Sequence, residues 1–202
     1  MSVSDRLKRR KRAINGSPPL PLRVGDRLKE PCDVDSRPQV LLEQFCHLDL
    51  WAKPSGLSML PESDDLEVFG GDGCGGCFYL WHAQARGEQI PVVYLSSYGE
   101  TSRLAPDFAT ALKIVVGFPS YWEEMLVHAH KGENLDDVIS WYEKDLKPEY
   151  AAARLELASL LELDLTTAKD DLLTAVHAQP PFAPTLNCGR PTQAGSFKNR
   201  YA

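Results

Sequence analysis

The sequence predicts an α+β fold in which a small antiparallel sheet is flanked by helices and followed by a helical C-terminal extension. Three observations support this class. Short apolar runs rich in β-branched and aromatic residues are confined to residues 77–104, and a stretch with five glycines in seven residues lies directly before them. From residue 106 onward the apolar residues recur at helical spacing. Strands and helices are therefore segregated along the chain, which favours α+β over an alternating parallel sheet.

The 202 residues are enough for one domain with a substantial core, and their composition suggests four parts. Residues 1–37 are expected to form a basic, Pro-rich tail and lead-in that is mobile in part. Residues 38–130 would form the α+β core, and residues 131–179 a helical extension packed on it. Residues 180–202, which open with a Pro-rich stretch, would form an irregular C-terminal tail.

The first helix is expected from Gln39 to Leu50, before the Pro-Ser-Gly sequence that begins at residue 54. Two strands are expected at Cys77–His82 and Ile90–Ser96. The connection between them is short, polar and contains a glycine, so an antiparallel hairpin is the simplest pairing. A third strand would run over residues 100–104.

Helices are then expected at residues 106–116, 120–130, 134–146, 149–161 and 167–178. Ser120 and Glu123 have the spacing of a capping box, in which each side chain bonds an otherwise unpaired amide. Asn134 can cap the third helix. Thr167 with Asp170 gives the last helix a similar start.

The net charge of −6 hides an asymmetry between the N-terminus and the rest of the chain. Residues 1–16 carry a net charge of +5, which leaves −11 on the remaining residues. An acidic body disfavours nucleic-acid binding, which depends on Lys and Arg, and favours a basic protein partner. Binding of nucleic acid through the basic run at residues 6–12 is the alternative. No apolar run approaches the roughly 18 residues of a membrane span, so the expected location is cytoplasmic.

The glycine-rich stretch does not have the features of a phosphate-binding loop. Such a loop opens a helix and carries a lysine, whereas this stretch opens an apolar strand and has no lysine nearby. Glycines allow positive φ angles and close approach of other groups to the backbone. We therefore expect Gly70, Gly73, Gly75 and Gly76 to bend the chain into the central strand of the sheet.

Cys74 and Cys77 have the spacing of a metal-binding or redox cysteine pair. A zinc site would need a second pair of ligands, for which the candidates are Cys32, Cys46, His47 and His82. A redox pair normally starts a helix, and here a strand follows. We interpret the cysteines as small residues of a tight turn and expect no cofactor. A zinc- or thiol-dependent function built around these two cysteines is the alternative.

No catalytic motif is found in the sequence. The five histidines do not cluster, and Ser96-Ser97 lacks the Gly-x-Ser-x-Gly pattern of a nucleophile elbow. Most acidic pairs fall in the first turn of an expected helix, where the helix dipole favours them. Trp81, Trp122, Trp141 and the tyrosines are candidates for a binding face, but at these spacings most of them are expected to be core residues. The chain is therefore predicted not to be an enzyme.

The stretch from about Leu66 to Met125 contains a pattern of turn, strand and helix positions: Leu66–Gly73 (LEVFGGDG) with the small-residue turn and apolar strand after it, Ile90–Leu95 (IPVVYL), Thr101–Phe108 (TSRLAPDF) and Leu112. In this pattern the stretch, about 60 of the 202 residues, resembles the SUKH superfamily. The resemblance implies an antiparallel sheet wrapped by helices and a function in protein binding. Many bacterial members look like immunity proteins that neutralise a toxin, while others act as scaffolds.

This resemblance and the acidic body together predict a non-catalytic immunity protein that covers a basic toxin domain. The partner contacts are expected at acidic residues near the sheet and its loops. We assign them to Asp72, Glu88 and Glu100, together with Tyr98.

Overall fold

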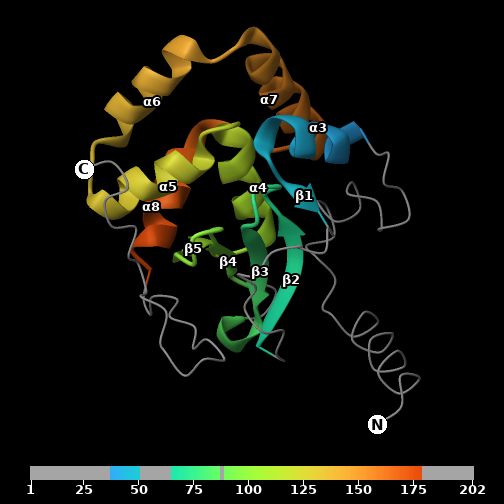
Figure 1. Ribbon diagram of the computed structural model, residues 1–202, viewed down its shortest axis with the longest axis vertical. Helices are drawn as coiled ribbons and strands as arrows, with labels where there is room; N and C mark the ends of the chain where they lie inside the picture. The colour runs from blue at the N-terminus through green and yellow to red at the C-terminus, as the bar shows by residue number, and fades with distance from the viewer. Residues whose placement is uncertain (1–36, 51–64, 87–88, 179–202) are drawn as a thin grey trace.

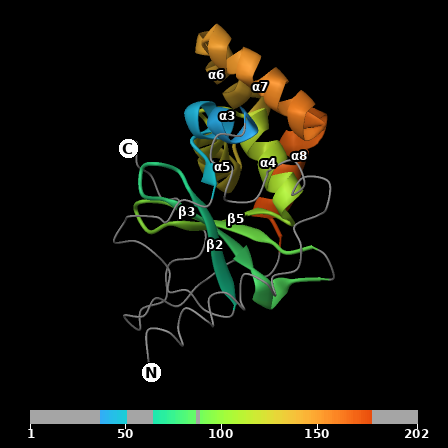
Figure 2. The ribbon, with the colours of Figure 1, turned by 90° about the vertical axis from the view of Figure 1, so that its right-hand side faces the viewer.

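The computed structural model describes residues 37–50, 65–86 and 89–178 (Figure 1). These residues form a five-stranded antiparallel sheet and six α-helices, which confirms the predicted α+β class. Seen from the side in Figure 2, the helices lie together on one side of the sheet. No helix formed by this part of the chain is long and apolar enough to cross a membrane.

The strands lie in the sheet in the order in which they occur along the chain, and each is antiparallel to its neighbours. They are β1 (Asp49–Leu50), β2 (Leu66–Gly71), β3 (Cys77–Trp81), β4 (Val92–Leu95) and β5 (Thr101–Ala105). The predicted hairpin is confirmed, because β3 and β4 pair antiparallel. The strand that follows the glycine turn, β3, is the middle strand of the sheet.

The prediction of a single helix from Gln39 to Leu50 is wrong at its C-terminal end. Helix α3 (Arg37–Cys46) stops before His47, whose φ of 54° is left-handed and cannot continue a right-handed helix. The chain then forms β1, which pairs with the end of β2. Neither of these two strands was predicted as such.

Five helices follow the sheet, close to the predicted positions: α4 (Phe108–Gly117), α5 (Trp122–Lys131), α6 (Leu135–Asp145), α7 (Pro148–Leu161) and α8 (Ala168–Val176). Asn134 caps α6, as predicted, by accepting a hydrogen bond from the amide of Asp136. Asp107 caps α4 in the same way, through the amide of Thr110.

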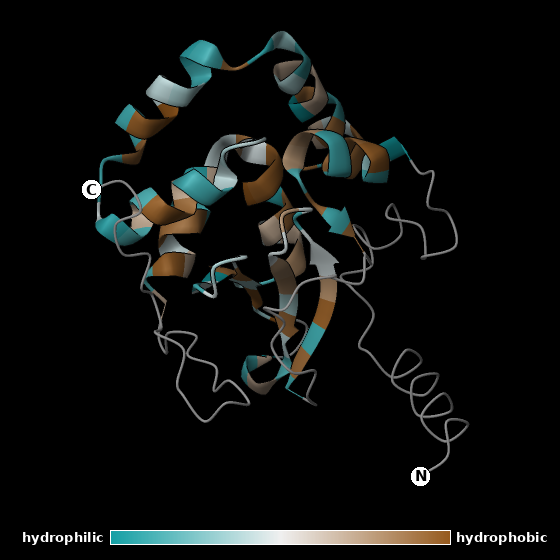
Figure 3. Ribbon diagram, viewed as in Figure 1, coloured by the Kyte–Doolittle hydropathy of each residue, from teal (hydrophilic) through white to brown (hydrophobic). Residues whose placement is uncertain are grey.

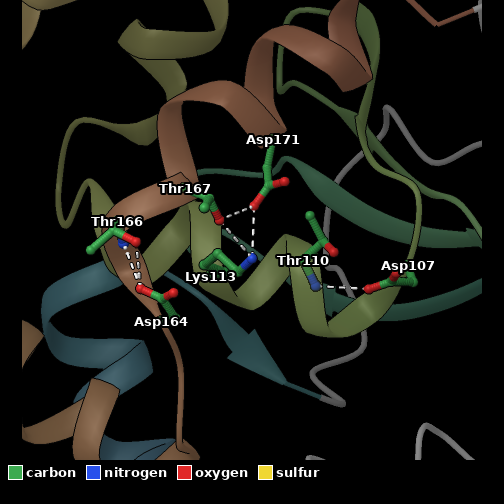
Figure 4. A network of polar contacts seen from close by, with 7 residues as sticks. All are labelled: Asp107, Thr110, Lys113, Asp164, Thr166, Thr167 and Asp171. Carbon is green, nitrogen blue, oxygen red and sulfur yellow. Dashed lines mark hydrogen bonds and ion pairs between the residues drawn. The ribbon is translucent and has the colours of Figure 1, made fainter.

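The predicted capping box of Ser120 and Glu123 is wrong, whereas Thr167 does precede α8 as predicted. Ser120 has a left-handed φ of 67°, and α5 begins after Tyr121 without a side-chain cap. Thr167 also makes no capping hydrogen bond. Its hydroxyl instead donates to Asp171, and the ammonium group of Lys113 donates to both side chains, which ties α8 to α4 (Figure 4).

The main core lies between the sheet and the helices and is rich in aromatic side chains. The ring of Trp122 lies 5.3 Å from that of Phe78 and 4.8 Å from that of Tyr94, measured between ring centroids. The indole nitrogen of Trp122 donates a 2.9 Å hydrogen bond to the carbonyl oxygen of Cys46. The start of α5 is therefore fixed both to the sheet and to the end of α3.

The helices of residues 131–179 share this core. Apolar residues of α7 and α8 belong to the same buried cluster as the sheet: Ala153, Leu157, Leu161, Ala168 and Leu172. The contact is so close at Gly117 that a Cβ there would lie 2.9 Å from the Cβ of Ala168. Helix α6 packs less deeply. It mixes hydrophilic and hydrophobic residues (Figure 3). Leu135 is its buried residue, and Val138, Ile139 and Tyr142 are partly buried.

Candidate functional site

Two turns form one end of the sheet. The glycine turn (residues 72–76) joins β2 to β3, and the β4–β5 turn (residues 96–100) joins the next pair of strands. Because Cys77 lies opposite Leu95 in the sheet, the two turns leave it side by side. A Cβ on Gly75 would lie 3.6 Å from the Cβ of Ser97, so the turns are in van der Waals reach.

The glycine turn is held together by the side chain of Asp72. One carboxylate oxygen accepts hydrogen bonds from the amides of Cys74, at 2.7 Å, and Gly76, at 2.8 Å. The amide of Asp72 in turn donates to the carbonyl oxygen of Gly76. Within this closed turn Gly73 has a φ of 73° and Gly75 a φ of 101°, which explains the choice of glycine at both positions.

Gly70 and Gly76 are required for a different reason, because other groups approach the backbone closely. A Cβ on Gly70 would lie 2.9 Å from the carbonyl oxygen of Asp49. A Cβ on Gly76 would lie 2.2 Å from Oδ2 of Asp72 and 2.5 Å from the hydroxyl oxygen of Tyr94. The geometry thus accounts for all four glycines that the sequence assigned to the turn.

Beneath the turn lies a cluster of two acids and a tyrosine. The hydroxyl of Tyr94, on β4, lies 2.5 Å from Oδ2 of Asp72 and also contacts Oε1 of Glu123, in the first turn of α5. A hydroxyl has one proton and can donate to only one of the two acids. Favourable contact with both therefore requires a second proton, on one of the carboxyl groups.

Glu123 is the group whose surroundings favour that second proton. Burial and, to a smaller extent, the negative charge of Asp72 outweigh the opposing effect of the Tyr94 hydrogen bond and raise the pKa of Glu123 to about 7. Burial, together with the two acids, also raises the pKa of the Tyr94 phenol, which stays protonated. Protonated Glu123 can donate to Tyr94, which donates to Asp72, which accepts from the amides of the glycine turn.

The cluster contains groups that serve in acid–base catalysis, but a substrate cannot reach Asp72 or Tyr94, and only Glu123 is partly exposed. Asp72 is 6% exposed and Tyr94 1% exposed. Their oxygens are already engaged by one another and by the amides of the turn. The arrangement therefore suits a structural role better than a catalytic one. We call Asp72, Tyr94 and Glu123 the clamp, because together they fix the glycine turn.

Asp72 was expected among the exposed acids that contact a partner, and its burial corrects this. Tyr98, by contrast, is 73% exposed in the β4–β5 turn. This turn is ordered by Ser96, whose hydroxyl oxygen accepts from the amides of Tyr98 and Glu100. Glu100 is half-buried. Glu88 lies outside the described residues.

The two cysteines of the turn have different environments. Cys74 is exposed, whereas Cys77 is buried on β3, and burial raises the pKa of its thiol. A raised thiol pKa disfavours the thiolate that redox chemistry and metal binding need. In residues 37–50, 65–86 and 89–178, no three His, Cys, Asp or Glu side chains come together as metal ligands would. Cys32 lies outside these ranges.

A serine–histidine pair that the sequence did not indicate lies at the C-terminal end of α5. Nε2 of His130 lies 2.7 Å from the hydroxyl oxygen of Ser102, on β5. Ser102 is only 2% exposed, and its hydroxyl also lies within hydrogen-bond distance of the carbonyl oxygen of Arg103. The pair therefore ties α5 to the sheet and is not accessible as a nucleophile.

Comparison of the chain with protein-family models, with curated proteins and with solved structures found no match.

Proposed function

We propose that the chain is a non-catalytic protein-binding module and that its docking surface is the end of the sheet formed by the glycine turn and the β4–β5 turn. The observation that carries this proposal is Tyr98, a large side chain that is 73% exposed on a turn whose backbone is ordered by Ser96. Tyrosine supplies a large, amphipathic contact surface at a low cost in side-chain entropy, and for this reason it is enriched in binding sites.

The rigidity of both turns supports this role. Binding costs less free energy when the contact loops are ordered beforehand. The carboxylate of Asp72 orders the glycine turn, and two amides bonded to one hydroxyl order the neighbouring turn. The clamp thus fixes the glycine turn through side chains in the interior, while Tyr98 and Cys74 are exposed to solvent on the two turns.

The partner that we propose is a bacterial toxin with a basic surface, which the chain neutralises by covering it. The resemblance of residues 66–125 to the SUKH superfamily supports an immunity function. The net charge of −11 outside the first 16 residues complements a basic surface, as a nuclease-like domain would present.

The proposal predicts that the chain binds the product of the toxin gene beside its own gene and suppresses its toxicity. The test is to express that toxin with and without the chain and to isolate the complex. Growth rescue with a stoichiometric complex is the expected result. Failure to bind or to rescue would reject the immunity function.

Tyr98→Ala is expected to weaken binding of this toxin by tenfold or more, since a central tyrosine contributes about 1.4 kcal/mol or more to such interfaces. Isothermal titration calorimetry measures the affinity. The matched control is Leu155→Ala, which removes an equally exposed side chain from α7. An equal loss for both variants would place the contact elsewhere.

A further inference from the structure

A second candidate binding site lies where the helices after the sheet meet. A cleft of about 350 Å³ is bounded by the start of α5, the end of α6 and the start of α7. Its volume is at the lower end of the range for small-ligand pockets, roughly 300–1,000 Å³. Four aromatic residues line it, Tyr121, Trp141, Tyr142 and Tyr150, together with the charged residues Asp145 and Lys147.

The aromatic wall of the cleft is a packed unit. Tyr121 and Tyr142 are stacked, with ring centroids 4.9 Å apart and an angle of 4° between the rings. Trp141 meets Tyr142 edge-on at 4.6 Å. On the far side Tyr150 is held edge-on against Phe45 of α3 at 5.2 Å.

Polar contacts fix this wall in place. The hydroxyl of Tyr121 donates a 2.5 Å hydrogen bond to Glu143 of α6. Arg154 of α7 donates to both carboxylate oxygens of Glu143, at 2.5 and 3.1 Å, and this ion pair lowers the pKa of that carboxyl group. The three helices around the cleft are therefore connected, and Glu143 is already neutralised.

Trp141 and Asp145 are the parts of the cleft still open to a ligand. Trp141 is 62% exposed although it belongs to the wall. Asp145 is four residues further along α6, so it lies on the same face of the helix one turn away. Its carboxylate has no ion-pair partner among the described residues. An aromatic face and a carboxylate thus border the same space.

We propose that this cleft binds the side chain of an arginine or lysine on the surface of a protein partner. Aromatic faces carry negative electrostatic potential and attract cations, and Asp145 adds a full negative charge. Residues 134–162, which include both α6 and α7, hold seven acidic and three basic side chains, a net charge of −4. This charge complements a basic partner and disfavours an anionic one.

The cleft is next to the proposed docking surface along the chain. Tyr121 lines the cleft, and Glu123, two residues later, belongs to the clamp under the glycine turn. The identity of the partner as a protein rests on the proposed function, but the preference of the cleft for a cation does not.

One residue of the cleft opposes a cation. Lys147 lies at its edge, just before α7, and repels a positive ligand. Lys147→Gln is therefore expected to tighten binding of a cationic probe about twofold to fivefold.

The test uses the full chain labelled with ¹⁵N and follows the indole resonance of Trp141, which Trp141→Phe identifies. The probes are N-acetyl-arginine methylamide and N-acetyl-citrulline methylamide, which have nearly the same shape but differ in charge. We expect a saturable shift with the arginine probe and at least fivefold weaker binding of the citrulline probe. Equal binding of the two probes, or no saturable shift, would overturn the proposal.

A matched pair of variants tests the role of the carboxylate. Asp145→Asn should weaken binding of the arginine probe about threefold or more, whereas Asp170→Asn removes the same charge from α8, outside the cleft, and should leave it unchanged. Equal losses in both variants would show attraction by net charge alone and would overturn the assignment to the cleft.

Other occupants give different results. Tighter binding of N-acetyl-phenylalanine methylamide would identify an apolar site and contradict the proposal. Replacing the six basic residues between positions 6 and 12 by glutamine in the full chain tests the chain's own tail as the occupant. A shift of the Trp141 resonance in that variant without any probe would also contradict it.

If the arginine probe binds but no toxin complex forms, the proposed function fails and the cleft assignment stands. If the toxin complex forms but the arginine probe does not bind, the cleft assignment fails and the proposed function stands.

Discussion

Replacing Gly76 with alanine is expected to lower the free energy of unfolding by about 3 kcal/mol or more. The added methyl group would lie 2.2 Å from Oδ2 of Asp72 and 2.5 Å from the hydroxyl oxygen of Tyr94. Neither group can move away cheaply, because Asp72 is bonded to two amides and Tyr94 is packed against Trp122. The substitution therefore separates two buried hydrogen-bonding groups as well as overfilling the site. Urea unfolding of the purified protein measures the effect.

Two other glycines of the same stretch are matched controls. Gly71→Ala should cost well under 1 kcal/mol, because its Cβ would lie 3.4 Å from the nearest atom, an ordinary contact. Gly73→Ala should cost about 1–2 kcal/mol, since the site has open space but a φ of 73°. A loss at Gly76 no larger than at Gly73 would contradict the close packing of the clamp.

The contribution of Glu123 to the stability of the protein is expected to fall as the pH rises from about 4.5 to about 7. Burial raises the pKa of Glu123 from 4.5 to about 7, so the folded state binds a proton in this range that the unfolded state has released. The contribution is fully present below pH 4.5, decreases up to about pH 7 and is then absent. Its size is on the order of 3 kcal/mol or less.

Glu123→Gln isolates this contribution. The amide of glutamine can donate to Tyr94 as the protonated acid does, without titrating. The variant should therefore be more stable than the wild type above pH 7 and similar to it near pH 4.5. Urea unfolding across this range gives the difference between the two proteins. A difference that does not change between pH 4.5 and 8 would contradict a titrating Glu123.

The measured quantity must be the difference in unfolding free energy between the wild type and Glu123→Gln, because other groups titrate as well. Burial lowers the pKa of His130, so its contribution is lost as the pH falls below 6.5, which is the opposite direction. The ion pair with Arg154 lowers the pKa of Glu143, whose contribution is lost only below pH 4.5. Both are present in the wild type and in Glu123→Gln, and they cancel in the difference.

The fold class could be predicted because the sequence features that indicate it are local. The apolar periodicity changes at residue 106, and the polar connection between Cys77–His82 and Ile90–Ser96 is short, so both the helices and the hairpin follow from neighbouring residues. Strand β1 could not be predicted, because it has two residues and is defined only by pairing with Gly70 and Gly71. What ends α3 is the backbone conformation of His47, which the sequence does not reveal.

The clamp could not be predicted because its partners are far apart in the sequence. Tyr94 is 22 residues from Asp72 and 29 residues from Glu123. Local reasoning assigned Glu123 to a capping box with Ser120, but its carboxyl group turns to Tyr94 instead. Asp72 was expected to be one of the exposed acids near the sheet and its loops, whereas its hydrogen bonds with the turn place it inside.

The sequence indicated the exposure of Tyr98 but not that of Trp141. Tyr98 could be recognised because it follows a short strand and precedes a glycine, which indicates a turn. Most of the aromatic residues were expected in the core; Trp122 is buried, but Trp141 is an exception, since it is 62% exposed. Both occur in helices with amphipathic spacing, and only the depth to which α6 packs distinguishes them.

The central claim is that the glycine turn and the β4–β5 turn together form a docking surface. The most direct measurement is to compare amide ¹H–¹⁵N spectra of the chain alone and bound to an inactive form of the toxin encoded beside it. We predict the largest shifts at residues 73–75 and 97–100, extending to the start of α5 and the Trp141 indole. Shifts confined to the opposite end of the sheet, at residues 82–86, would contradict the claim.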